Sequence, residues 1–177
     1  MTEDEARRRR SAAIAGHTGD ADTARSLLGD PSPAVRATAL GALSRLAALR
    51  VDEHAAALDD PAATVRRRAV ALAANVPGDH PPSILAALGD DDSVVAETAA
   101  WACGERSPAE PGAAAALTSL ATTHNEHLVR EAAIAALGAI GDPIGLPAVL
   151  AALDERATLR RRAVVALAAF DGPEVDD

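Results

Sequence analysis

The chain has 177 residues, 49% of them hydrophobic, and a formal net charge of −9. This length and apolar content allow a sizeable core. The acidic balance argues against a general nucleic-acid or anionic-membrane binder, which would carry a basic surface. Aromatic residues make up 1% of the chain, and the two present are Trp101 and Phe170. Because β-structure favours aromatic and β-branched residues, whereas alanine is the best helix former, this Ala-, Leu- and Val-rich chain is predicted to be all-α.

The chain has one cysteine, Cys103, and no long apolar run. A single cysteine excludes an internal disulfide and a cysteine-based zinc site. Neighbouring repeats carry small or apolar residues at the same position, so we expect a buried structural thiol. No apolar stretch approaches the ~18 residues of a membrane span, and the N-terminus lacks the apolar core of a secretion signal. We therefore expect a cytoplasmic protein with no membrane association.

The first predicted element is a helix over residues 4–16, which contains the arginine run from Arg7 to Arg10. Three consecutive residues of a helix spread over about 200°, so only one or two of them share a face. We interpret this run, and the runs at 66–68 and 160–162, as solvated helix starts.

Five segments with a common pattern follow, namely PAVRATALGAL, ATVRRRAVALA, SVVAETAAWAC, HLVREAAIAAL and ATLRRRAVVAL. Their anchor residues are Val35, Val65, Val95, Val129 and Leu159, at intervals of 30, 30, 34 and 30 residues. Alanine stands four residues after every anchor, and an apolar or small residue stands eight after. Offsets 0, 4 and 8 share one helical face, so each segment is predicted to be an amphipathic helix.

A shorter helix is predicted before each segment, with the ends at Leu28, Leu58, Leu88, Leu120 and Leu153. Prolines and glycines such as Pro77-Gly78 separate the helix pairs. One pair cannot bury its apolar stripe alone, so the pairs must stack. We predict a single domain over residues 1–177, with the helix at 4–16 lying against the first pair. The predicted repeats span about 20–48, 52–76, 81–106, 111–141 and 145–170, and a tail occupies 171–177.

Asp five residues before the anchor, Val at the anchor and Arg after it resemble the HEAT-repeat family over about residues 20–170. The segment GAIGDPIGLPAVLAALDE resembles the phycobilisome-lyase-like branch of that family. The resemblance implies a right-handed α-solenoid of about five HEAT-like helix pairs. It also implies that the pairs Asp30/Arg36, Asp60/Arg66 and Asp154/Arg160 support the turns and form a ladder. The sequence departs from the pattern at Ala96, in place of Arg, and at His124, in place of Asp.

In this family the second helix of each pair lines the concave surface. Offsets +2, +6 and +9 from the anchor lie opposite the buried face. They place Glu97, Trp101 and Glu131 at mid-array, with Arg67 and Arg161 one repeat away on either side. A tryptophan among small residues is a typical interface anchor. Two interpretations stay open for Trp101, an exposed anchor or a core residue that fills a gap.

Some HEAT-like arrays are enzymes, and the resemblance allows them to be weighed. Deoxyhypusine hydroxylases bind their metals through His-Glu dipeptides, where this chain has Ala96-Glu97 and Arg130-Glu131. For His124, Glu126 and His127, loop capping is favoured over a lone metal site. HEAT-like DNA glycosylases use a basic groove with aromatic residues, against which the charge and the scarcity of aromatics weigh. No bilin-directed residue can be identified for a lyase, and fold does not imply function.

The sequence therefore predicts a non-enzymatic scaffold or adaptor that binds a protein or peptide on its concave surface, with no catalytic residues, metal or cofactor. The alternative is a nucleic-acid-binding or DNA-repair-like module that uses Arg67, Arg161 and Trp101, and its binding would weaken steeply with salt. The last predicted helix is followed only by DGPEVDD, without a capping helix. We expect Val164 and Phe170 to form an exposed apolar patch there, with self-association or partner capping through this C-terminal end.

Overall fold

The computed structural model describes residues 2–75 and 82–170, which form helices and turns and contain no β-strand. This confirms the all-α prediction for the described residues. The chain divides into two compact units, an N-terminal unit of residues 1–82 and a C-terminal unit of residues 83–177. The break predicted at Pro77-Gly78 and the tail predicted at 171–177 lie outside the described residues. No helix in the described part is both long and apolar enough to cross a membrane.

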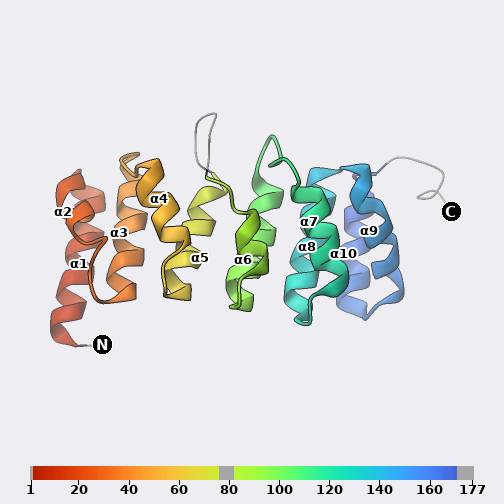
Figure 1. Ribbon diagram of the computed structural model, residues 1–177, viewed down its shortest axis with the longest axis horizontal. Coiled ribbons are helices and arrows are strands. Elements are labelled where there is room, and N and C mark those ends of the chain that lie inside the picture. Colours follow the sequence, from red (N-terminus) through yellow and green to blue (C-terminus); the bar gives the residue numbers. More distant parts are fainter. Residues whose placement is uncertain (1, 76–81, 171–177) are drawn as a thin grey trace. The chain divides into compact units, whose positions relative to one another are not determined.

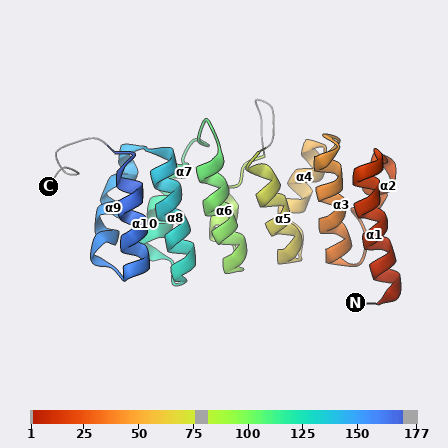
Figure 2. The ribbon, with the colours of Figure 1, turned by 180° about the vertical axis from the view of Figure 1, so that it is seen from behind.

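The N-terminal unit is a double layer of helices. Its elements are α1 (Glu3–Thr18), α2 (Ala21–Ser26), α3 (Pro33–Arg45), α4 (Val51–Leu58) and α5 (Ala63–Ala73). Helix α3 packs between α1 and α5, while α2 packs on α1 and α3, and α4 on α5. Within this unit α2 and α4 are nearer the viewer in Figure 1, and α1, α3 and α5 are nearer in Figure 2.

Helix α1 has well-defined signals at both ends. The Thr2 hydroxyl accepts the N–H of Glu5, and the Glu5 carboxylate accepts the N–H of Thr2, which is a capping box. The helix ends at Gly19, whose φ of 84° is the left-handed conformation that glycine adopts without strain. It packs on α2 and α3, as expected for the helix predicted over residues 4–16.

The C-terminal unit repeats this double layer. Its elements are the 3₁₀ turn η1 (Leu85–Gly89), then α6 (Ser93–Glu105), α7 (Ala113–Thr123), α8 (His127–Ile140), η2 (Pro143–Gly145), α9 (Leu146–Ala151), η3 (Ala152–Asp154) and α10 (Ala157–Leu167). Helix α8 packs between α6 and α10, while η1 packs on α6, α7 on α8, and α9 on α8 and α10. Figure 2 shows α6, α8 and α10 side by side in the layer that faces the viewer.

The first helix of the third repeat differs from the prediction. The segment before Leu88 was expected to be a short α-helix, but it forms the 3₁₀ turn η1. Pro82 cannot donate a backbone hydrogen bond and Gly89 favours a break, so the few residues between them are too short for a stable α-helix. Leu88 is nevertheless buried, so the turn still supplies the apolar contact of a first helix.

The predicted anchors form the core of both units. Each of the five is at most 1% exposed, and the alanine four residues later is fully buried in every repeat. The anchors are Val35, Val65, Val95, Val129 and Leu159, and the alanines are Ala39, Ala69, Ala99, Ala133 and Ala163. The predicted buried face of every second helix is therefore confirmed.

The buried face of α6 also contains Cys103, which has no solvent exposure. Burial in apolar surroundings disfavours the thiolate and raises the pKa of Cys103 to about 11. At neutral pH this side chain is a thiol, which is a poor nucleophile. The prediction of a structural cysteine is confirmed.

Two helical glycines allow the second helices of the C-terminal unit to pack closely. A Cβ placed on Gly104 of α6 would lie 2.9 Å from the Cα of Ala136 on α8. A Cβ on Gly138 of α8 would lie 2.6 Å from the Cα of Ala166 on α10. Both distances are shorter than van der Waals contact, so only glycine permits this backbone approach.

The apolar patch predicted at the end of α10 is present in part. Val164 and Val165 are exposed, at 59% and 75%. Phe170 is buried, so the prediction that it belongs to an exposed patch is wrong. After α10 the N–H groups of Ala169 and Phe170 donate to the carbonyls of Ala166 and Leu167. This extra turn carries the phenyl ring back into the unit, where its apolar surface is removed from water.

Candidate functional site

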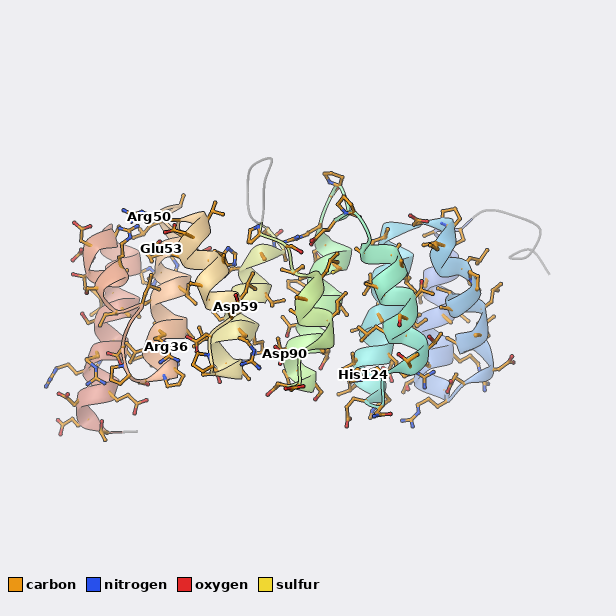
Figure 3. The ribbon with its side chains drawn as sticks, viewed as in Figure 1. Arg36, Arg50, Glu53, Asp59, Asp90 and His124 are labelled. Carbon is orange, nitrogen blue, oxygen red and sulfur yellow. The ribbon has the colours of Figure 1, made fainter. Side chains whose placement is uncertain are left out.

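In four of the repeats, one side chain closes the turn between the two helices of the pair. The Asp30, Asp60 and Asp90 carboxylates accept the N–H two residues later, at 2.8, 2.8 and 2.9 Å. His124 takes the same role, because its Nδ1 accepts the N–H of Glu126 at 3.1 Å. Figure 3 shows Asp90 and His124 at the same end of the helices of the C-terminal unit. His124 therefore caps its turn in the way that aspartates commonly do.

The N-terminal unit also carries a ladder of ion pairs between neighbouring repeats. Arg8 Nε lies 2.6 Å from Asp30 Oδ2, and Arg36 Nη2 lies 2.7 Å from Asp60 Oδ1. Arg36 contacts the Asp30 turn through the backbone carbonyls of Asp30 and Pro31, at 2.8 and 3.3 Å. Arg66 likewise donates to the Asp60 carbonyl at 2.9 Å. The ladder implied by the family resemblance is thus present, but the Asp30 and Asp60 carboxylates pair with arginines of α1 and α3, while Arg36 and Arg66 donate to the backbone carbonyls of the turns of their own repeats.

These contacts shift the pKa values of the turn aspartates. The hydrogen bond from Arg8 lowers the pKa of Asp30 below its ordinary value. Burial alone would raise the pKa of Asp60, but the hydrogen bonds from Arg36 and from the Ala62 N–H outweigh burial and lower it. Both carboxylates are therefore held in the charged form, as expected for acids that accept charged donors.

The corresponding ion pair of the C-terminal unit uses a glutamate in place of the turn aspartate. Arg130 Nη2 lies 2.5 Å from Glu155 Oε1, and Arg130 Nε donates to the Ala121 carbonyl. Arg160 donates to the carbonyls of Leu153 and Glu155. Asp154, expected as the partner of Arg160, is exposed. Glu155, one residue after Asp154 and with a longer side chain, therefore forms the ion pair with Arg130.

Residues of α6, α8 and α10 in the C-terminal unit line a hollow of about 440 Å³, which we call the tryptophan hollow. These three helices form the layer nearer the viewer in Figure 2. Helix α6 contributes Val94, Glu97, Thr98, Trp101, Gly104 and Glu105, helix α8 contributes Leu128, Glu131, Ala132, Ala135, Ala136 and Ala139, and helix α10 contributes Arg162. Its volume falls in the range of about 300–1,000 Å³ that is common for ligand sites.

Three large apolar side chains of the tryptophan hollow are open to solvent. Val94 is 45% exposed, Trp101 44% and Leu128 51%. The alternative that Trp101 fills a gap in the core does not agree with this exposure. The neighbouring small residues on α8 leave the space beside the indole open. Exposed apolar side chains that gather in one concave place are typical of interaction sites.

The charges of the tryptophan hollow are unbalanced. Glu97, Glu105 and Glu131 contribute three carboxylates, against the single guanidinium of Arg162. The Oε1 atom of Glu131 is shielded from solvent and has no hydrogen-bond partner among the residues that the structure describes. A buried acceptor without a donor costs about 1–3 kcal/mol, and more when it is charged. Glu131 is thus an unsatisfied group beside an open space.

The structure brings together three of the five residues proposed from the sequence. Glu97, Trp101 and Glu131 line the same hollow. Arg161 is exposed but does not line it, and Arg162 does. Arg67 is exposed on α5 of the N-terminal unit.

Arg162, Val94 and Leu128 also line the hollow but were not among the predicted site residues. Arg162 stands three residues after its anchor, and the equivalent Arg68 of the N-terminal unit places its guanidinium against Gly41 of the preceding second helix, α3. A side chain three residues after the anchor can therefore reach toward the preceding second helix. The prediction had considered the position two residues after the anchor instead. A sequence signal existed for Val94 and Leu128, because they precede their anchors at a position where the other repeats have Ala34, Thr64 and Thr158.

Stacked helix pairs with a buried anchor and a regular turn define a helical-repeat protein of the α-solenoid class. The family described as HEAT repeats matches residues 81–169, and a single HEAT repeat matches residues 23–49. The chain belongs to the HEAT-repeat family. A comparison with curated proteins gave no match.

Solved structures of similar fold include an enzyme and designed repeat proteins. Human deoxyhypusine hydroxylase, in complex with glycerol, is similar at 18% identity and a TM-score of 0.59, over 92% of this chain and 78% of that one. A designed armadillo repeat protein in complex with the peptide (KR)4 is similar at 20% identity and a TM-score of 0.65, over 93% and 90%. Another designed armadillo repeat protein is similar at 19% identity and a TM-score of 0.65, over 92% and 90%. At these identities the similarity concerns the fold alone.

Proposed function

We propose that this protein is a non-enzymatic scaffold or adaptor that binds a protein or peptide partner on the concave surface of its second helices, at the hollow on α6, α8 and α10. The observation that carries the proposal is the tryptophan hollow, where an exposed indole stands beside open space and above small side chains. Trp and Arg are the residue types most enriched among those that dominate binding energy. Both Trp101 and Arg162 line this hollow.

Two further observations support a protein or peptide partner. The exposed Val94 and Leu128 offer apolar contact area next to Trp101, and the carboxylates offer hydrogen-bond acceptors. This combination of an apolar centre and polar groups is common in protein interfaces. One of the similar solved structures, a designed armadillo repeat protein, holds a peptide.

The alternative nucleic-acid-binding function relies on Arg67, Trp101 and Arg161. Three glutamates in the tryptophan hollow and a net charge of −9 oppose it, because a phosphate backbone is bound through neutralising cations. The two functions differ in their response to salt, since a nucleic-acid complex would weaken steeply as salt is added.

The proposal is tested by capture from a lysate with the immobilised chain, its Trp101→Ala variant and a Val51→Ser control. Val51 is 64% exposed on α4, outside the tryptophan hollow, so the control also removes an exposed apolar side chain. We expect a protein that binds the native chain and the control, survives nuclease treatment and is lost with Trp101→Ala. Equal capture by all three chains, or capture that nuclease abolishes, would refute the proposal.

A further inference from the structure

We infer that the tryptophan hollow receives a basic side chain of the partner, with an apolar residue of the same peptide beside it. This inference rests on the proposed function and names the chemistry of the occupant. Three features carry it, namely the unsatisfied Glu131 carboxylate, the exposed indole of Trp101 and the excess of negative charge.

The unsatisfied oxygen of Glu131 identifies what is missing. An ionised carboxylate only accepts hydrogen bonds, so the absent partner must be a donor. Although Arg162 lines the same hollow, Oε1 of Glu131 has no hydrogen-bond partner within residues 2–75 and 82–170. The strongest donors for a shielded carboxylate are charged N–H groups such as guanidinium and ammonium. A ligand with such a group would satisfy Glu131, whereas a carboxylate or phosphate would be repelled.

Trp101 adds a second preference for a cation. It stands four residues after Glu97 on α6, so the two side chains share one helical face. A cation over the exposed indole interacts with the negative face of the ring. The same group would be attracted by the Glu97 carboxylate. A single basic side chain in the hollow can therefore use the indole for stacking and the carboxylates for hydrogen bonds.

The charge balance and the shape fit one such side chain. Three carboxylates against one guanidinium leave the hollow with an excess of two negative charges, which a bound cation would reduce. Val94 and Leu128, both exposed, provide an apolar contact on α6 and α8. A volume of about 440 Å³ accommodates a long basic side chain together with part of its apolar neighbour.

The experiment uses a random peptide library, selected on the intact chain and counter-selected on its Trp101→Ala variant. Selected peptides are synthesised with arginine and with citrulline, its uncharged analogue, at each basic position. Trp101 is the only tryptophan and the chain has no tyrosine, so intrinsic fluorescence reports on this hollow directly. Each affinity is measured from the change in tryptophan emission on titration of the synthetic peptide.

We expect the selected peptides to contain arginine or lysine next to an apolar residue. Replacing that arginine by citrulline should weaken binding about tenfold or more, because a charge-assisted hydrogen bond is lost. Glu131→Gln should weaken the arginine peptide by a similar factor and leave the citrulline peptide almost unaffected. Glu126→Gln is the matched control, since Glu126 is exposed at the start of the same helix and does not line the hollow. It should change neither affinity.

Two results would overturn the inference in different ways. Peptides that change Trp101 emission but bind equally well with citrulline, or that are selected for acidic residues, would refute the basic occupant and leave the proposed function standing. If no selected peptide depended on Trp101, both the inference and the proposed function would fail.

Discussion

The two units of this protein pair their charged residues differently. In the N-terminal unit Arg8 pairs with Asp30 and Arg36 pairs with Asp60, so these carboxylates are satisfied within the protein. In the C-terminal unit Arg130 pairs with Glu155, while Glu131, the next residue along α8, has an oxygen that finds no partner in the described part of the chain. Arg130 and Glu131 are adjacent on α8, but Arg130 pairs with the next repeat whereas Glu131 lines the hollow.

The difference extends to the space between the second helices. In the N-terminal unit the guanidinium of Arg68 lies against Gly41, which is six residues after its anchor. In the C-terminal unit the equivalent position on α6 is the exposed Trp101. Internally satisfied charges stabilise a fold, whereas unsatisfied charges and exposed apolar residues cost stability and are typical of functional sites. The comparison therefore separates a mainly structural region from a candidate binding region.

The largest expected effect on stability comes from breaking the ladder of the N-terminal unit. Asp60→Ala leaves Arg36 without its carboxylate and the Ala62 N–H without its acceptor. Because both side chains of this pair are mostly buried, we expect a loss of about 2–3 kcal/mol in the free energy of unfolding. Glu155→Ala should cost less than about 1 kcal/mol, since Glu155 is 39% exposed.

Denaturant unfolding measures both variants, and Asp59→Ala is the control because Asp59 is exposed beside Asp60. If Asp60→Ala and Glu155→Ala lowered the free energy of unfolding equally, the ion pairs of the two units would not differ in strength as proposed.

A smaller effect is expected from filling the close contact between α8 and α10. In an open helical position Gly→Ala stabilises by about 1 kcal/mol. At Gly138 the added Cβ would meet the backbone of Ala166, so we expect Gly138→Ala to destabilise by about 1–3 kcal/mol. Gly89→Ala in the same unit meets nothing within 4 Å and should be neutral or slightly stabilising. Thermal unfolding compares them, and a stabilised Gly138→Ala would show that the helices do not approach this closely.

Acid should weaken the same N-terminal ladder progressively. The pKa values of Asp30 and Asp60 are lowered in the folded protein, below the ordinary value of 3.8. A carboxyl with a lowered pKa contributes stability that is complete above its unfolded pKa and is lost as the pH falls through its folded pKa. The stability advantage of the native chain over Asp60→Asn should therefore be constant near neutral pH and shrink below about pH 4. Urea unfolding across this range measures it, and a difference independent of pH would contradict the pairing.

The fold was largely predictable because it depends on a short repeating pattern. A residue that recurs at a fixed interval with alanine four positions later determines a helical face, and all five anchors are buried as predicted. The 3₁₀ turn at Leu85–Gly89 was not predicted. In so short a segment, packing against neighbouring elements determines whether an α-helix or a 3₁₀ turn forms. The burial of Phe170 depends on a turn after α10 that no sequence pattern indicated.

The candidate site was predictable only in part. Helical offsets brought Glu97, Trp101 and Glu131 together because they belong to adjacent helices in the same register. The offset alone does not say whether a long side chain points to the preceding or the following helix. That direction separates Arg162, which lines the hollow, from Arg161, which does not. The unsatisfied oxygen of Glu131 likewise depends on the placement of its neighbours in space.

If the exposed face of α6, α8 and α10 binds the partner through Trp101, replacing this one residue should separate binding from stability. Trp101→Ala is measured twice, by thermal unfolding and by titration with a captured partner or a selected peptide that carries its own label. Because the indole is 44% exposed, we expect a melting temperature close to that of the native chain. Binding should weaken by about 2 kcal/mol or more, as for other aromatic hot spots. A large drop in melting temperature with unchanged binding would show instead that Trp101 is a structural residue and that the partner binds elsewhere.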